Sequence, residues 1–301
     1  MNTKTIKAVL KKKFNAWLAT IEDDSVRKLV EQNTIITGGC IASMLMNEAP
    51  NDIDLYFRDK ETVKAVAEYY IEQWNSENPK RNDATVIDGA EHVFRNTTAE
   101  QIKILVPSEG IAGDDTDGRD DMAEILESLE DAPEATQEEP AKKQYRPIFI
   151  TMNAITLSNK IQIVVRFYGE PGKIHETYDF EHCCCYWDSK DGTLVTPEKA
   201  LLAIMNKYLF YRGSRYPLCS IVRMRKFIKR GWTINAGQIL KMAFQVSELN
   251  LHDIDVLEDQ LIGVDTAYFI QVVNALRTMA DKNPEFSFDS TYLATIVDRI
   301  F

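Results

Sequence analysis

Two aspartates, Asp52 and Asp54, lie in a short stretch, residues 51–57. The apolar residues Ile53 and Leu55 alternate with them. Side chains alternate between the two faces of a strand, so this stretch predicts both carboxylates on one face. Like charges held side by side cost free energy unless a cation lies between them. Carboxylates suit Mg²⁺, which keeps phosphate oxygens as further ligands. The pair therefore predicts a site for Mg²⁺ carrying a nucleoside triphosphate.

Two glycines, Gly38 and Gly39, follow the short apolar stretch 34–37 and precede a helix-like run at 40–47. A glycine has no Cβ, so the backbone can come close to a triphosphate. Backbone N–H groups at the start of the next helix can receive phosphate oxygens. A solvated surface strand also explains a lone Asp-x-Asp pair, but the diglycine, the helix and the strand in this order favour the metal site.

The pattern of diglycine, helix and hydrophobic-Asp-x-Asp-hydrophobic strand resembles the nucleotidyltransferase superfamily typified by DNA polymerase β. The resemblance implies that Asp52 and Asp54 are catalytic and bind Mg²⁺, and that Gly38 and Gly39 bind the nucleotide. In such a site two ions about 4 Å apart stabilise the attacking hydroxyl and the departing pyrophosphate. The implied fold is α+β, with a small mixed β-sheet and flanking helices followed by an all-helical domain.

A two-metal site commonly takes a third acid from a neighbouring strand, and Asp179 is the candidate, with Glu181 in reserve. Residues 176–187, ETYDFEHCCCYW, predict a strand. The Asp179-Phe180 pair resembles part of a motif in class II CCA-adding enzymes and bacterial poly(A) polymerases. Tyr178 stands where that motif has arginine, a departure that favours a protein that keeps the fold without the reaction.

Residues 217–234 resemble a nucleotide-binding helix of the same enzymes. Arg223, Lys226 and Arg230 recur at three- and four-residue spacing, which predicts one helix face that binds phosphate. Ile221, Met224 and Ile228 are expected to pack on another face. The alternative is a solvated basic helix surface.

Charge is unevenly distributed along the chain, whose net charge is −11. Residues 109–139 hold 13 acidic residues and one arginine, whereas residues 199–247 hold ten Lys or Arg and no acidic residue. The acidic stretch predicts a solvated insert at about 109–141, or else a nucleic-acid mimic that covers the basic half. The basic stretch predicts a phosphate-facing surface, with an RNA acceptor as its partner.

No run of about 18 apolar residues occurs, so no membrane partner is expected, and the adjacent cysteines fit reduced thiols in a cytoplasm. Hydrophobic periodicity divides the chain near residue 195, with a nucleotidyltransferase-like catalytic domain over 1–195 and a basic helical domain over 196–301. The expected helices lie within 1–32 and at 40–47, 60–75, 197–211, 217–230, 236–249, 255–261, 266–279 and after 290. The expected strands lie at 34–37, 51–57, 84–88, 101–106, 148–158, 161–167 and 176–187, with a turn at 159–160.

These features predict a Mg²⁺-dependent nucleotidyltransferase that moves a nucleoside monophosphate from an NTP to an acceptor hydroxyl, with an RNA 3′ end such as that of tRNA as the leading acceptor. One alternative is a catalytically inactive protein of this fold that binds nucleic acid or protein. Another is a toxin-type enzyme, since the signature resembles toxin nucleotidyltransferases of abortive-infection systems. As a whole the chain resembles nucleotidyltransferase-like proteins carried by tailed bacteriophages.

Overall fold

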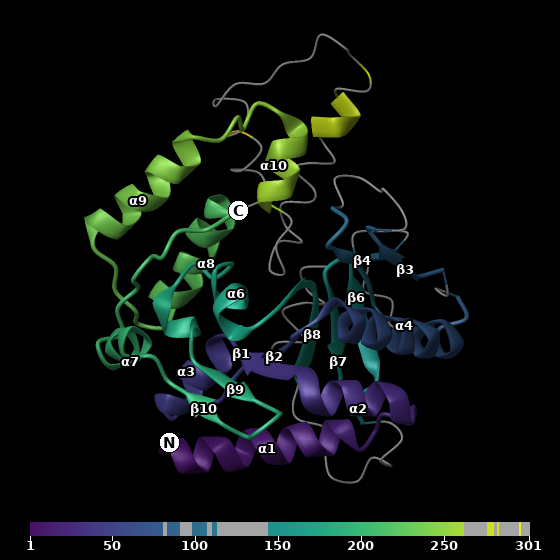
Figure 1. The fold of residues 1–301 in the computed structure, drawn as a ribbon. Coiled ribbons are helices and arrows are strands. Elements are labelled where there is room, and N and C mark those ends of the chain that lie inside the picture. Colours follow the sequence, from purple (N-terminus) through teal and green to yellow (C-terminus); the bar gives the residue numbers. More distant parts are fainter. Residues whose placement is uncertain are drawn as a thin grey trace. The chain divides into compact units, whose positions relative to one another are not determined.

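The computed structural model describes residues 1–80, 83–90, 98–106, 110–112, 144–261 and 276–279, together with residues 282 and 295. The chain forms two compact units, Met1–Asn206 and Lys207–Phe301 (Figure 1). Most of the acidic stretch, much of the helix expected at 266–279 and nearly all of the region after Ser290 lie outside the described residues.

The first unit contains a mixed eight-stranded sheet with the order β10-β9-β1-β2-β8-β7-β6-β5. Among the described strands, β2 and β8 run parallel and the other neighbours in this sheet run antiparallel. The expected α+β architecture is confirmed. The strands are β1 (Thr34–Thr37), β2 (Ile53–Phe57), β5 (Gly110–Ala112), β6 (Pro147–Thr151), β7 (Ala154–Leu157), β8 (Ile161–Tyr168), β9 (Tyr186–Asp188) and β10 (Leu194–Val195).

One face of this sheet is apolar and covered by helices α1 (Thr3–Leu18), α2 (Asp24–Asn33) and α4 (Lys60–Glu77) (Figure 1). Phe14 of α1 packs on the Trp187 ring of β9 at 5.3 Å between centroids. The buried register partners of that face run across five strands: Trp187, Ile36, Leu55, Ile163 and Ile155. Burial of this row is the main source of stability of the sheet.

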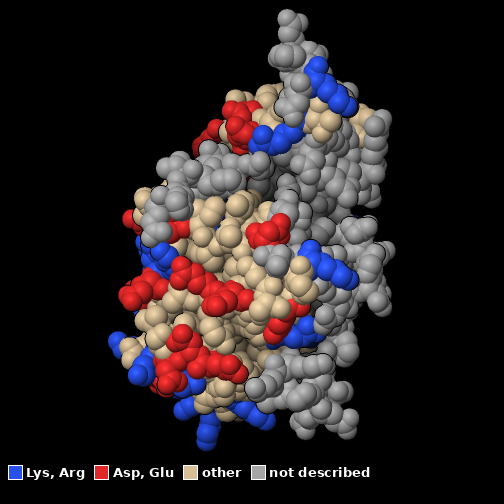
Figure 2. Space-filling model, turned by 90° about the vertical axis from the view of Figure 1, so that its right-hand side faces the viewer, with Lys and Arg blue, Asp and Glu red and all other residues tan. Residues whose placement is uncertain are grey.

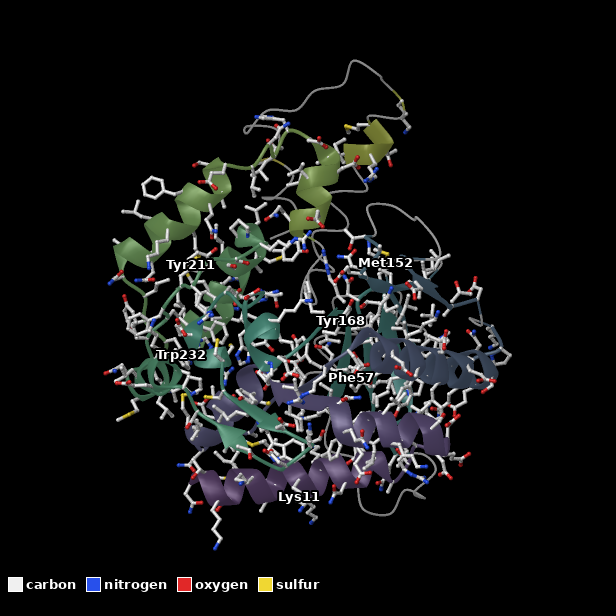
Figure 3. All side chains as sticks on the ribbon, in the orientation of Figure 1. Lys11, Phe57, Met152, Tyr168, Tyr211 and Trp232 are labelled. Carbon is white, nitrogen blue, oxygen red and sulfur yellow. The ribbon has the colours of Figure 1, made fainter. Side chains whose placement is uncertain are left out.

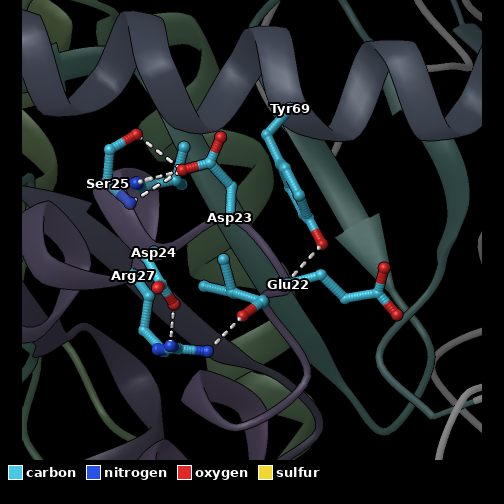
Figure 4. Close-up of polar contacts among 8 residues, drawn as sticks. Glu22, Asp23, Asp24, Ser25, Arg27 and Tyr69 are labelled. Atoms are coloured by element: carbon cyan, nitrogen blue, oxygen red, sulfur yellow. Dashed lines mark hydrogen bonds and ion pairs between the residues drawn. The ribbon is translucent and has the colours of Figure 1, made fainter.

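Side-chain caps decide where several helices begin. Asp23 accepts hydrogen bonds from the backbone N–H groups of Ser25 and Val26, at 2.7 and 3.1 Å, at the start of α2 (Figure 4). These bonds satisfy donors that have no partner inside the helix, and the hydrogen bonds from Ser25 and Val26 lower the pKa of Asp23. Asp59 caps α4 in the same way through the N–H of Thr62 at 2.7 Å.

The strands expected at 84–88 and 101–106 are β3 (Thr85–Asp88) and β4 (Ile102–Leu105), and they pair with each other in a second, two-stranded sheet. Asp88 connects this sheet to α4, because its carboxylate accepts from the ammonium of Lys60 and lies 3.5 Å from that of Lys64. The side chain of Asp88 is only 10% exposed, so water solvates its charge poorly. The two lysines therefore compensate this charge.

The strand expected over residues 176–187 is wrong for most of its length. The chain forms α6 (Pro171–His175), a turn and the 3₁₀ helix η2 (Glu181–Cys183), and within this stretch only β9 is a strand. The backbone N–H groups of Cys183 and Cys184 bond back to the carbonyls of Phe180 and Glu181, at 3.3 and 3.0 Å. Local bonds of this kind replace the ladder to a neighbouring strand, so the strand that was expected to carry Asp179 and Glu181 does not form there.

The second unit contains α8 (Pro217–Lys229), α9 (Ala236–Ser247) and α10 (Ile254–Leu261). The helix expected over 197–211 is α7 (Glu198–Met205), which ends earlier and belongs to the first unit. Tyr211 donates its hydroxyl to Gln245 at 2.5 Å, and Trp232 is buried against Phe227 (Figure 3 labels Tyr211 and Trp232). Ile221 and Ile228 are 38% and 46% exposed, so the prediction that both pack is wrong.

Candidate functional site

The turn between β1 and the short helix α3 (Gly39–Leu45) lies directly beside Asp54. Gly38 adopts φ +95°, and a Cβ on this residue would be 2.6 Å from Oδ2 of Asp54. The backbone conformation therefore disfavours any other residue here, and an added Cβ would force the Asp54 carboxylate to move. The sequence predicted a diglycine turn next to the aspartates, and the structure brings Gly38 and Asp54 into contact. At Gly39 a Cβ would meet nothing within 4 Å.

The two aspartates share one neighbourhood. Asp52 is exposed and immediately precedes β2, while Asp54 is half-buried within it, between the buried residues Ile53 and Leu55. Burial raises the pKa of the Cys40 thiol well above its usual range, and the charges of Asp54 and Asp52 raise it further. Both carboxylates therefore act on the first turn of α3. The alternation predicted for this strand places them on the side of α3 and Gly38.

A row of polar side chains crosses the sheet at the level of Asp54. Thr37 of β1 is its register partner on one side, and Gln162 of β8 is its partner on the other. Gln162 pairs in turn with Thr156 of β7, and Thr37 with Tyr186 of β9. Direct cross-strand partners point to the same face of a sheet, so these side chains share the face of Asp54. Sequence reasoning missed Gln162; its polar side chain inside the apolar run 161–165 was the available signal.

Thr37 forms hydrogen bonds with the end of α6 and with the segment that follows this helix. Its hydroxyl lies 2.9 Å from Nε2 of His175 and donates to the carbonyl of Cys185, also at 2.9 Å. Because the hydroxyl has a single proton, His175 donates from Nε2 to the threonine oxygen. The backbone N–H of Gly38 donates to the carbonyl of Cys183 at 3.2 Å. These bonds fix the turn on which the Asp54 carboxylate lies.

Tyr178 occupies the surroundings of Asp54, at the position where the resemblance implied arginine. Its ring packs edge-on against Tyr56 at 6.0 Å and lies 5.2 Å from the His175 ring. Burial holds the pKa of Tyr178 well above its usual range, and the nearby Tyr56 and Asp54 act in the same direction. A buried neutral phenol here supplies no positive charge for a phosphate.

Asp179 is 5% exposed and lies in the turn before η2 rather than on a strand. Within the part of the chain that the structure describes, no three or more His, Cys, Asp or Glu side chains are close enough to hold a metal ion together. The described side chains thus do not join Asp179 to Asp52 and Asp54 as a three-ligand cluster.

The basic residues singled out in the sequence lie in the second unit. Arg223 and Lys226 belong to α8, and Arg230 is its C-terminal cap. Arg223 is half-buried, whereas Lys226 and Arg230 are exposed. Their assignment to nucleotide or RNA binding stays a prediction.

Solved structures of CCA-adding enzymes are similar to this chain. The enzyme of Bacillus stearothermophilus, in complex with CTP, shares 14% identity over 89% of this chain and 52% of its own, with a TM-score of 0.38. The Thermotoga maritima enzyme, in complex with tRNA, shares 12% identity over 92% of this chain and 57% of its own, with a TM-score of 0.37. Both scores are low, so the fold class rests on the helices and strands described above.

The family model for the Gabija anti-defense 2 family protein matches residues 8–207, well over half of the chain. The chain belongs to this family. A curated relative, Gabija anti-defense 2 of Bacillus phage SPbetaL7, is 20% identical over 252 residues, which make up 83% of this chain and 46% of the relative. The chain therefore spans about half the length of that relative.

Proposed function

We propose that the first unit binds the Mg²⁺ complex of a nucleoside triphosphate at Gly38, Asp52 and Asp54, and transfers the nucleoside monophosphate to an acceptor hydroxyl. The observation that carries this proposal is the contact between Gly38 and Asp54, in which the missing Cβ leaves room for Oδ2 of the carboxylate. A carboxylate held over a bare backbone turn, with Asp52 beside it, suits a cation and the phosphates that accompany it.

The residues fit a magnesium ion that takes its remaining ligands from the substrate. Asp52 and Asp54 supply two anionic oxygen donors, one exposed and one half-buried. Magnesium prefers such ligands and is commonly bound by one or two carboxylates plus substrate phosphates. When bound, the ion would neutralise charge on the triphosphate. Asp179 is not among the ligands that we assign, because it is buried outside the sheet.

The acceptor that we favour is an RNA 3′ end. The sequence 199–247 has no acidic residue and ten Lys or Arg, nine of which belong to the second unit, and this supports a phosphate-binding surface in that unit. One side of the molecule differs, because acidic side chains gather there (Figure 2). The exposed acidic residues of α2 and α4 include Asp24, Glu31, Glu61, Glu68 and Glu72. A polyanion is repelled from such a surface.

Membership of the Gabija anti-defense 2 family leads us to propose a biological setting as well. We propose that nucleotide binding or transfer at this site is how the chain counteracts the Gabija defence. Among the described helices, none is long and apolar enough to cross a membrane.

A second candidate function is nucleotide binding without transfer. Tyr178, a buried neutral phenol at the place where the resemblance implied arginine, favours this alternative. Such a protein would bind the Mg²⁺–NTP complex through the same aspartates and label no acceptor.

The test is incubation with α-labelled NTPs, Mg²⁺ and total RNA, followed by detection of labelled polymer. Wild-type protein should label RNA, and Asp52→Asn and Asp54→Asn should abolish the label. Asp24→Asn, which changes the same charge on α2, should leave it unchanged. Labelling that persists in both site variants would refute the proposed site, and binding of NTP with no labelled acceptor would establish the second candidate.

A further inference from the structure

Both residues in direct register with Asp54 are neutral. β1 places Thr37 on one side, and β8, the strand parallel to β2, places Gln162 on the other. Neighbouring strands lie about 4.8 Å apart. A side chain at position 162 thus stands immediately beside the Asp54 carboxylate.

The pairing on the opposite face confirms this register. Leu55, the next residue after Asp54, pairs with Ile163, the next after Gln162, and both are buried in the apolar row. On the site face the following residues, Tyr56 and Val164, meet in one buried cluster. A shift by one residue would reverse both arrangements. Gln162 therefore shares the face of Asp54, where it is half-buried.

The side chain at this position decides how much positive charge the site can hold. Two divalent ions repel each other strongly at the separation of about 4 Å found in two-metal sites. A carboxylate beside Asp54 would offset that repulsion as a third anionic ligand. The Gln162 carboxamide has no charge and offers one carbonyl oxygen and two N–H donors.

We propose that Gln162 restricts the site to a single divalent ion, the one that accompanies the nucleotide, and that its amide donates to a phosphate oxygen of that nucleotide. This inference rests on the proposed function, since it concerns the same site. Among the described side chains, no cluster of three metal-binding groups stands near the aspartates or elsewhere, in agreement with one ion held by two protein carboxylates.

The experiment counts Mn²⁺ ions bound per chain by electron paramagnetic resonance, with an ATP analogue whose α–β bridging oxygen is replaced by a methylene group. Free Mn²⁺ and free Mn²⁺–analogue complex are removed by rapid gel filtration before the ions on the chain are counted. Wild-type chain should bind one ion and Gln162→Asp should bind two. Gln162→Asn keeps the charge and should bind one. Thr156→Asp adds a carboxylate one strand further along the same row and should also bind one.

Two ions on the wild-type chain would overturn the inference, and so would one ion on Gln162→Asp with unchanged analogue affinity. The wild-type count decides the matter even if the aspartate variant unfolds, which circular dichroism would reveal. Failure of the proposed function has a different signature. In that case the wild-type chain and Asp54→Asn would both bind neither ion nor analogue, and the inference would fall with it.

Discussion

Oδ2 of Asp54 lies so close to the backbone of Gly38 that a Cβ on residue 38 would be 2.6 Å from it. This contact joins two features that the sequence places in separate segments, a diglycine turn and a pair of aspartates. This contact lies at the centre of the candidate site. It predicts that replacing Gly38 affects both stability and ligand binding.

Gly38→Ala should destabilise the chain and weaken NTP binding. The backbone conformation of Gly38, with φ +95° and ψ −159°, is unfavourable for an L-residue by about 1–3 kcal/mol, and the new methyl group would displace the Asp54 carboxylate. Urea unfolding and NTP titration measure the two effects. Gly39→Ala is the matched control for stability, because a Cβ there meets nothing within 4 Å. Equal stability of the two variants would show that Gly38 is not constrained as described.

Thr37→Val should lower the free energy of unfolding by about 1–3 kcal/mol, because it leaves buried polar groups of His175 and Cys185 without their partner. Thr37→Ser keeps the hydroxyl and should lose much less. Chemical denaturation of the three proteins gives the answer. A cost of Thr37→Val that is no larger than the cost of Thr37→Ser would show that the hydroxyl is not the group that stabilises the turn.

Asp88 should make the stability of the first unit depend on acid pH. Burial opposes ionisation, but the hydrogen bonds from Lys60 and Ala90 and the charges of Lys60 and Lys64 outweigh it and lower the pKa of Asp88. A carboxylate whose pKa is lower in the folded state stabilises the fold above its unfolded pKa of about 3.9. This contribution is lost as the pH falls through the folded value.

The variant Asp88→Asn should therefore cost about 1 kcal/mol at neutral pH, as for a partly exposed ion pair, and progressively less as the pH falls below about 3.9. Thermal unfolding across this pH range measures the difference. A cost that stays constant with pH would mean that the charge of Asp88 is not involved. Asp191→Asn is an instructive comparison, since hydrogen bonds to Thr193 and not a lysine partner are the main cause of the lowered pKa of Asp191.

The basic residues of α8 should contribute to RNA affinity mainly through charge. Replacing Arg223, Lys226 and Arg230 by glutamine should make the binding of single-stranded RNA less dependent on salt. The slope of log K against log salt concentration should become shallower by about 0.7 for each phosphate that the protein no longer neutralises. The control replaces Lys4, Lys7 and Lys11 on α1 by glutamine (Figure 3 labels Lys11). These lysines are exposed, and their replacement removes the same total charge. Equal slopes for both triple variants would assign the effect to net charge alone.

Local patterns in the sequence were sufficient for the centre of the site. The short run at 34–37, which is buried throughout, and the alternation at 51–57 correctly predict β1 and β2. The diglycine correctly predicts a turn, because Gly38 adopts a φ that other residues rarely reach.

What the sequence could not supply is the order of the strands. Gln162 becomes the neighbour of Asp54 only because β8 lies beside β2, and a pairing over more than a hundred residues leaves no local pattern. Residues 176–187 mislead for the opposite reason. Their aromatic and small apolar side chains suit a strand, but bonds within the segment turn it into η2.

The most direct measurement is calorimetric titration of NTP into wild-type, Asp52→Asn and Asp54→Asn protein, with Mg²⁺ and with EDTA. We predict binding that requires Mg²⁺ and that weakens at least about tenfold in each variant, equivalent to about 1.4 kcal/mol. Asp24→Asn should bind as the wild type does. NTP binding of equal strength in all four proteins, or binding that is unchanged by EDTA, would contradict the assignment of these aspartates to a metal–nucleotide site.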